Sequence, residues 1–149
     1  LPVTRVLLDT NVVLRLLEKE DPQHGVVRAA VDRCVASGRE PCLAPQVVVE
    51  FWVVATRPRE ANGLGWDPPT ARAAVDGLVS LFPMLPDAPE TFAKWLRLVT
   101  EGGVSGKRAH DVRLAAAALS NGVGEVLTLN PVDFADVPGL AVLQVSTSE

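Results

Sequence analysis

The stretch VTRVLLDTNVVLRLLEK, residues 3–19, predicts a buried strand that leads directly into a helix. Residues 3–8 form a short apolar, β-branched run that is typical of a buried strand. The Asp-Thr-Asn tripeptide at residues 9–11 follows, and all three residue types are favoured at helix N-caps. Residues 12–19 then read as a helix, so the fold begins with one strand–helix unit.

The same alternation of strands and helices continues along the chain. Strands that alternate with helices form a parallel sheet covered by helices. We therefore predict an α/β fold with a central parallel sheet of about four to five strands flanked by helices. No repeat or linker interrupts the pattern, so residues 1–149 are predicted to form a single domain. After the first unit, helices are predicted at 26–35, 67–81, 89–101 and 109–120, strands at 41–44, 84–85, 125–129 and 140–145, and a loop at 130–136.

Residues 46–56 are consistent with either a strand or a helix. Their richness in β-branched residues favours a strand. Their length of eleven residues favours a helix, as does the preceding Pro45, because proline suits the first turn of a helix. On residue propensity alone, we favour the strand.

Composition argues against several classes of protein. The chain has 149 residues, enough for one globular core, and no apolar run reaches the roughly 18 residues that a membrane span needs. The N-terminus lacks the features of a signal peptide, so we expect a cytoplasmic protein with no membrane partner. A net charge of −4 disfavours a protein that coats nucleic acid nonspecifically. Cys34 and Cys42 lack metal-binding spacing and are interpreted as core residues.

Three isolated carboxylates lie in apolar surroundings. Asp9 ends the first apolar run, Glu50 interrupts a valine-rich segment, and Asp111 begins an alanine-rich helix. Moving a lone carboxylate into an apolar setting is costly unless the group is paired, protonated or bound to a metal. Three such acids suggest a site that gathers negative charge to hold a cation.

Most of these acids also have a purely structural interpretation. Asp9 can cap the first helix, and Asp111 can interact favourably with the dipole of a helix N-terminus. Asp133 can be a turn residue. However, Asn130 and Asp133 follow a predicted strand, as Asp9 does, and open parallel sheets bind ligands beyond the carboxyl ends of their strands. This placement favours a site.

Four short segments follow one another along the chain in a characteristic order. They are LLDTN at 7–11, PQVVVE at 45–50, HD at 110–111 and LTLNPVDF at 127–134. Together they resemble the PIN-domain ribonucleases, and most closely the VapC toxins of bacterial toxin–antitoxin pairs. The run TRPREANGLG at 56–65 is similar to a stretch common in that toxin family. The resemblance covers nearly the whole chain. It implies a single PIN-like domain in which the segment carrying Glu50 is a helix.

The resemblance also implies a metal site. Asp9, Glu50 and Asp111 match the three central acids of the family, and Asp133 is carried as the fourth, with Asn130 as a neutral neighbour. The implied cofactor is Mg²⁺ or Mn²⁺, hard cations that prefer oxygen ligands. Such an ion lowers the pKa of a bound water and neutralises charge on a phosphoryl group. The residues predicted to orient Asp9 or a metal-bound water are Thr10, Asn11, Thr128 and Asn130.

The implied function is a metal-dependent endoribonuclease toxin that hydrolyses RNA phosphodiester bonds and is inhibited by a cognate antitoxin. A homodimer is also expected. A groove between the helices of residues 12–35 and 71–81 would accept an amphipathic helix of the antitoxin. The basic residues that are candidates for binding the RNA backbone are Arg57, Arg59, Lys107, Arg108 and Arg113.

Two other functions remain open at this stage. An aspartyl phosphohydrolase would carry Asp-x-Asp after its first strand, but the third position here is Asn11, so this function ranks low. The second is a catalytically weak or inactive PIN-like module that binds RNA or protein. Asn130 leaves room for it, because family members often carry an acid at that position.

Overall fold

The sheet of this protein has four parallel strands within residues 3–145, the part of the chain that the computed structural model describes. Its strand order is β2-β1-β3-β4. The predicted α/β fold with a central parallel sheet is therefore confirmed. The strands are β1 (Thr4–Leu8), β2 (Arg39–Cys42), β3 (Glu125–Thr128) and β4 (Ala141–Gln144).

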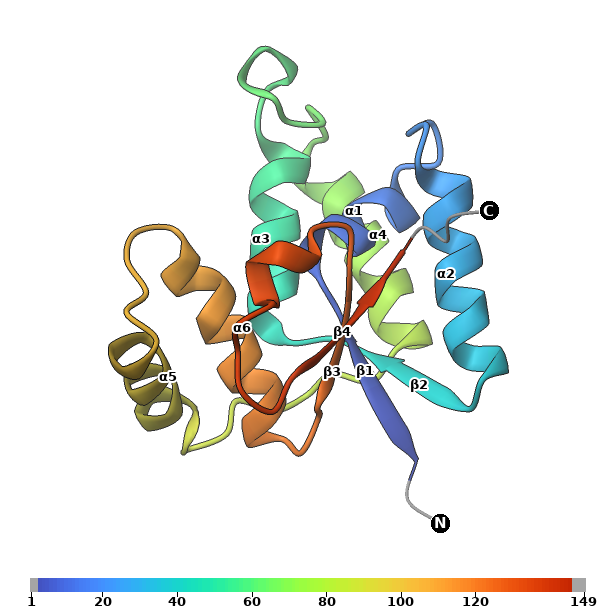
Figure 1. Ribbon diagram of the computed structural model, residues 1–149. Helices are drawn as coiled ribbons and strands as arrows, with labels where there is room; N and C mark the ends of the chain where they lie inside the picture. The colour runs from blue at the N-terminus through green and yellow to red at the C-terminus, as the bar shows by residue number, and fades with distance from the viewer. Residues whose placement is uncertain (1–2, 146–149) are drawn as a thin grey trace.

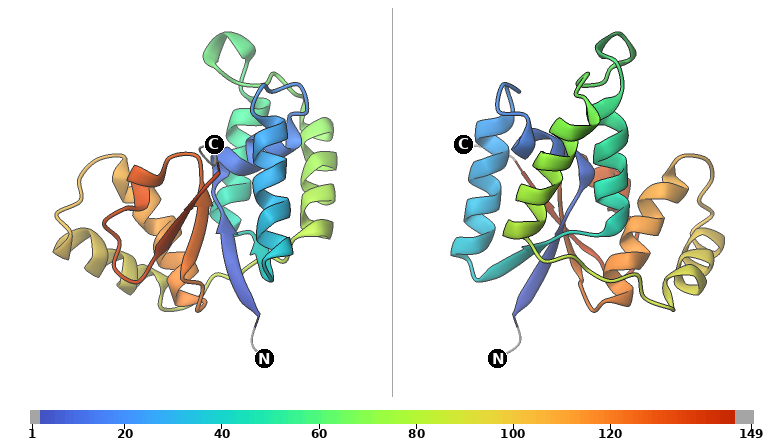
Figure 2. Two further views of the ribbon diagram at one scale, coloured as in Figure 1. Left: turned by 45° about the vertical axis from the view of Figure 1, so that its right-hand side comes forward. Right: turned by 180° about the vertical axis from the view of Figure 1, so that it is seen from behind.

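Helices flank this sheet (Figure 1, Figure 2). In chain order they are α1 (Thr10–Leu17), α2 (His24–Ala36), α3 (Pro45–Thr56), the 3-10 helix η1 (Arg59–Ala61), α4 (Pro68–Leu81), α5 (Thr91–Glu101), α6 (Arg108–Ser120) and the 3-10 helix η2 (Pro131–Phe134). None of the helices between residues 3 and 145 has the length and apolar character needed to cross a membrane.

The segments predicted at 84–85 and 130–136 differ from the structure. The strand predicted at 84–85 is reduced to a single parallel bridge between Leu43 and Met84, because prolines on both sides stop the ladder from extending. The loop predicted at 130–136 contains η2, which begins at Pro131. Proline has a backbone angle suited to a first helical turn, so this short helix has a local cause.

The strand favoured by propensity at 46–56 is wrong, and the helix implied by the family resemblance is correct. Helix α3 begins at Pro45 and buries Val47, Phe51 and Ala55, which recur every four residues and therefore share one face. Val49 and Val53 lie on its exposed side. Burial of this single stripe against the core outweighs the β propensity of the valines.

The core lies around β1, the strand that pairs with both β2 and β3. Val6, Leu7 and Leu8 are fully buried, and both cysteines are buried and free, as predicted. Leu8 is in register with Leu127 of β3. The residues that follow these two positions therefore lie side by side at the carboxyl edge of the sheet.

The chain reverses after α3 in a compact loop at residues 57–65, which projects beyond the carboxyl edge of the sheet (Figure 1). The backbone N–H of Gly65 donates to the Arg57 carbonyl, and an Arg57 guanidinium nitrogen donates to the Asn62 carbonyl. A Cβ at Gly63 would collide with the Arg57 backbone. Glycine is therefore required at this position for the loop to close.

Candidate active site at the carboxyl edge of the sheet

Asp9 is held between the end of β1 and the start of α1. Its Oδ1 accepts a hydrogen bond from the Thr10 N–H at 2.8 Å, and its Oδ2 accepts one from the Thr128 hydroxyl at 2.7 Å. Its own N–H donates to the Leu127 carbonyl at 3.0 Å. The side chain therefore caps α1, as the structural interpretation expects, and is also fixed to β3.

Burial makes the Asp9 carboxylate costly to ionise. The residue is only 8% exposed, and this desolvation raises its pKa above the ordinary value. The hydrogen bonds from Thr128 and Thr10 oppose the shift, whereas the negative charges of Glu50 and Asp133 add to it. The charges of two other predicted acids thus raise the pKa of Asp9, although these acids come from distant parts of the chain.

Glu50 is oriented by two neutral donors. The Thr10 hydroxyl donates to its Oε1 at 2.5 Å, and the Gln46 amide donates to its Oε2 at 2.9 Å. Gln46 Nε2 also reaches the His110 carbonyl at 3.0 Å, and its Oε1 accepts from Arg113 at 3.3 Å. Gln46 therefore links α3 to the first turn of α6. Sequence reasoning missed this role, for which the four-residue spacing to Glu50 on one helix face is the only local signal.

Asp111 lies in the first turn of α6, facing the same region. Desolvation, followed by the negative charges of Asp133, Asp9 and Glu50, raises its pKa to about 6, and Arg108 partly opposes this shift. Asp133 lies in η2, where its carbonyl accepts from Arg108 at 3.4 Å. The four acids therefore lie near enough to affect one another's ionisation, and each comes from a different element of the fold.

The predicted orienting residues form a small hydrogen-bonded network around Thr128. Besides donating to Asp9, its hydroxyl accepts from the Asn11 amide at 3.4 Å and from the Asn130 N–H at 3.0 Å. Asn11 Oδ1 accepts from the Leu129 N–H at 3.2 Å. Thr10, Asn11 and Thr128 use their side chains, whereas Asn130 contributes its backbone and leaves its side chain exposed.

A sequence model of the PIN domain matches residues 6–140, which is most of the chain. The chain belongs to the PIN domain family. The four acids and their network thus lie within the part of the chain that defines this family, and the resemblance found in the sequence is confirmed. No match emerges from a comparison with curated protein sequences.

Several solved structures share the fold of this PIN domain. DNA-bound VapBC from Salmonella typhimurium has a TM-score of 0.69 at 20% identity, covering 96% of this chain and 99% of that chain. FitAcB from Neisseria gonorrhoeae has a TM-score of 0.66 at 22% identity, covering 94% of this chain and 97% of that chain. VapC20 from Mycobacterium tuberculosis is described as a Sarcin-Ricin loop cleaving toxin. It has a TM-score of 0.60 at 16% identity, covering 91% of this chain and 98% of that chain. At identities this low, the structural similarity shows a common fold and nothing beyond it.

The donor set of the PIN domain fits a hard cation such as Mg²⁺, because all four candidate ligands are carboxylates. Within residues 3–145, no basic side chain forms an ion pair with any of the four acids, Asp9, Glu50, Asp111 and Asp133. In the same residues, no three acidic, histidine or cysteine side chains are arranged to surround one ion directly. The fit is therefore to an ion that contacts one or two carboxylates and keeps several waters, as Mg²⁺ usually does.

The basic residues predicted to bind RNA lie in two places. Lys107, Arg108 and Arg113 are at or near the start of α6, beside the acids. Arg57 and Arg59 belong to the loop after α3, about two helical turns beyond Glu50. The first group is thus next to the acids, and the second can be reached only by a longer ligand.

The raised pKa of Asp111 predicts a pH-dependent gain in stability from Asp111→Asn in chelator-treated protein. Unfolded aspartate ionises near pH 4, whereas Asp111 in the folded protein stays protonated to about pH 6. Its ionisation therefore removes stability as pH rises through this window. Because solvent screens this partly exposed group, we expect a gain on the order of 1 kcal/mol, about 3 °C in Tm.

The measurement is thermal unfolding in EDTA at pH 4.5 and pH 7.5. The gain should be present at the higher pH and nearly absent at the lower one. Asp87→Asn, at an exposed position, is the matched control for loss of one negative charge. A gain of the same size at both pH values would show that the ionisation of Asp111 is not its cause.

Proposed function

We propose that this PIN domain is a metal-dependent endoribonuclease of the VapC type, which hydrolyses RNA phosphodiester bonds with Mg²⁺ or Mn²⁺ and is inhibited by a cognate antitoxin. The observation that carries this proposal is the meeting of four acids from four elements, with the pKa of Asp9 and Asp111 raised. Perturbed carboxylates gathered in this way are typical of functional sites.

The residues of the site orient the acids without neutralising them. Thr10, Thr128 and Gln46 are uncharged donors, so they fix the Asp9 and Glu50 carboxylates while leaving their negative charge available. When bound between these acids and an RNA phosphate, Mg²⁺ or Mn²⁺ would lower the pKa of an attacking water and neutralise charge on the phosphoryl group. Asp9 and Asp111 would hold that ion, with Glu50 and Asp133 binding its waters.

Basic residues next to the acids would hold the RNA in place. Arg108 and Lys107 are at the N-terminus of α6, where backbone N–H groups also favour an anion. Arg113 lies on the same helix and is already directed toward Gln46. Arg57 and Arg59 would contact backbone further along the strand. This arrangement gives phosphate contacts that position the RNA relative to the acids.

Structural neighbours support the type of activity and its control. VapC20 is described as a Sarcin-Ricin loop cleaving toxin, and a neighbour from Klebsiella pneumoniae is described as a toxin-antitoxin complex. Other neighbours are VapBC and FitAB bound to DNA. A cell that carries such a nuclease needs an inhibitor. We therefore include a cognate antitoxin and a homodimer within that complex in the proposal.

The surface of this chain offers a groove for the antitoxin. A cavity of about 520 Å³ lies between α4 and the α1–α2 pair, as the sequence predicted for such a groove. Leu16, Val31, Leu78 and Phe82 supply apolar surface, and Val35 and Leu81 are exposed at its rim. An apolar groove between helices suits the apolar face of an amphipathic helix.

A catalytically weak or inactive binding module is the second candidate function. It is favoured by the absence, within residues 3–145, of three acidic, histidine or cysteine groups arranged around one point, and by the neutral Asn130. RNA that binds without being cleaved in Mg²⁺ or Mn²⁺ would identify the module. Metal-dependent cleavage would exclude it.

Asp9→Asn is expected to reduce RNA cleavage on the order of 100-fold or more, because the amide keeps the shape but loses the attraction for the cation. EDTA should stop cleavage by the parent protein, and Mg²⁺ or Mn²⁺ should restore it. The cooperative thermal transition should persist in EDTA, since the core does not depend on a metal. Cleavage by Asp9→Asn at the parent rate would disprove the metal-site assignment.

Gln46→Met is expected to lower cleavage about 10-fold, a typical effect of losing a group that orients a metal ligand. Methionine keeps the length and the helix propensity but removes the donor to Glu50 and to the His110 carbonyl. Gln23→Met, at an exposed position, is the control. Mn²⁺ titration by electron paramagnetic resonance should show weaker binding for Gln46→Met alone; unchanged binding and cleavage would assign Gln46 a purely structural role.

Leu81→Glu is expected to abolish co-purification of a small partner protein while RNA cleavage is retained. Leu81 is 74% exposed beside the groove, so a charge there should block an apolar helix without disturbing the core. Leu96→Glu, on the exposed face of α5, is the matched control. Mass spectrometry and light scattering identify the partner and the oligomer. Free, monomeric parent protein, purified from its native host, would contradict both the antitoxin and the homodimer.

A further inference from the structure

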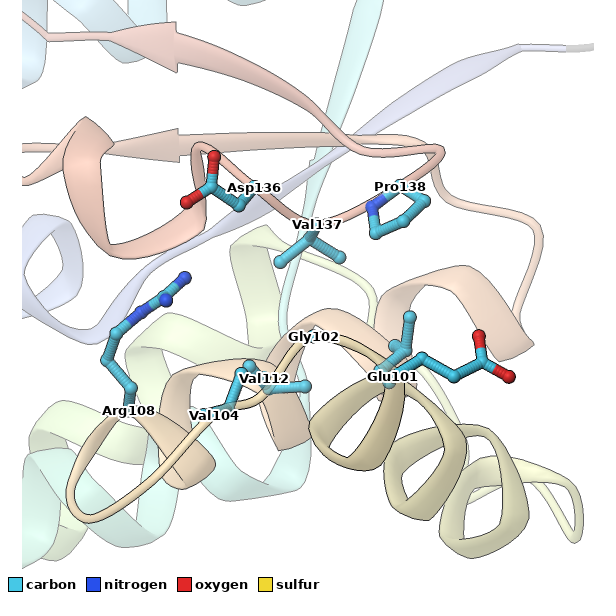
Figure 3. A pocket seen from close by; sticks show the side chains of 9 residues that line it. Glu101, Gly102, Val104, Arg108, Val112, Asp136, Val137 and Pro138 are labelled. Atoms are coloured by element: carbon cyan, nitrogen blue, oxygen red, sulfur yellow. The ribbon is translucent and has the colours of Figure 1, made fainter.

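A separate cavity adjoins the acids on the side of α5. It has a volume of about 280 Å³ and lies between the α5–α6 connection and the chain that joins η2 to β4 (Figure 3). Such a volume is at the lower end of ligand pockets, which span roughly 300–1,000 Å³, and suits one ring system. The walls are partly apolar, with Leu98, Val104, Val112, Val137 and Pro138 supplying the apolar surface.

Arg108 and Asp136 lie at the same end of this cavity (Figure 3). They do not form an ion pair, and within residues 3–145 the Asp136 carboxylate accepts no hydrogen bond. The buried Nε of Arg108 has no hydrogen-bond partner there. A buried, charged donor without a partner is costly, so a ligand that accepts from Nε after the Arg108 side chain turns toward the cavity would recover free energy. The cavity therefore presents the Arg108 guanidinium near the exposed carboxylate of Asp136, and the Glu101 carboxylate lines it as well.

The charged end of the cavity borders the acid site. Arg108 precedes Asp111 by three residues, which places both on adjacent turns of one face of α6. A second guanidinium nitrogen of Arg108 donates to the Asp133 carbonyl. A nucleotide whose phosphate lay at the acids could therefore extend its base into the cavity past Arg108.

We propose that this cavity binds a guanine base of the RNA, on the nucleotide next to the phosphodiester that is cleaved. This inference rests on the proposed ribonuclease function and adds a base preference to it. Sequence-specific recognition of RNA depends on unpaired bases that enter such pockets and are read along their edges. The apolar walls would cover the faces of the ring.

Guanine matches the donor and acceptor pattern of this cavity better than the other bases do. Its N7 and O6 accept hydrogen bonds, which suits the Arg108 guanidinium. The adjoining N1–H and N2 amino group donate, which suits the Asp136 carboxylate. Adenine has an amino group in place of O6, so it offers Arg108 one acceptor fewer, and uracil and cytosine lack N7.

The test compares cleavage of the single-stranded oligoribonucleotides UUGUU, UUAUU and UUUUU in Mg²⁺, as kcat/KM. One good bidentate contact is worth about 1–3 kcal/mol, so UUGUU should be preferred by about 10-fold or more. Asp136→Asn replaces one acceptor by a donor and should reduce the preference to about threefold or less. Asp87→Asn, at an exposed position outside the cavity, should keep the parent preference.

Val104→Phe gives a second, independent variant. Val104 lies in the connection before α6 and is only partly buried, so a phenyl ring there can fill the cavity with little effect on the core. We expect kcat/KM for UUGUU to fall about 10-fold and the guanine preference to disappear. Thermal unfolding shows that each variant is folded.

Bis(p-nitrophenyl) phosphate, a phosphodiester without a base, distinguishes failure of the guanine pocket from failure of the proposed nuclease function. Hydrolysis of this compound by the parent, together with equal or absent cleavage of the three oligonucleotides, overturns the guanine pocket. An unchanged guanine preference in Asp136→Asn also overturns it. Failure to hydrolyse the compound and to cleave any of the three oligonucleotides, in both Mg²⁺ and Mn²⁺, contradicts the proposed function itself, and the pocket with it.

Discussion

Four like charges must be held together at one edge of the sheet, and the rest of the structure meets this electrostatic constraint. Burial and mutual repulsion raise the pKa of Asp9 and Asp111, which shows that the arrangement opposes ionisation. The apolar core around β1 offsets this cost, with Val6, Leu7 and Leu8 fully buried directly before Asp9. Such an arrangement is useful only if a cation or a proton relieves the repulsion.

Neutral donors are the means by which the acids are held without losing their charge. Thr10 serves two acids at once, because its N–H binds Asp9 and its hydroxyl binds Glu50. Gln46 then joins Glu50 to the start of α6, and Thr128 joins Asp9 to β3. An arginine in any of these positions would orient a carboxylate equally well, but it would also compete with a cation. The choice of donors therefore argues for a cation site over a structural ion-pair cluster.

Three surfaces of the domain are spatially distinct, and this separation has consequences for control. The acids lie at the carboxyl edge of the sheet, the small cavity adjoins them along α6, and the large groove lies between α4 and the α1–α2 pair. A partner in the groove would not need to contact the acids in order to bind. The proposed binding of RNA and the proposed binding of an inhibitor should therefore be separable by substitutions in different elements.

The sequence by itself determined the order of strands and helices, the parallel sheet, and the placement of Asp9 beyond β1, because apolar runs and capping residues are local signals. It also grouped Glu50 and Asp111 with Asp9 as a candidate cation site, whereas Asp133 was added as the fourth acid from the family resemblance. Residue propensity favoured a strand where α3 lies and only the family resemblance implied a helix; in the structure, burial of one face overrides the propensity. Tertiary structure alone decided the roles of Gln46 and of Arg108 beside Asp136. These depend on contacts between residues far apart in the chain, which no local pattern records.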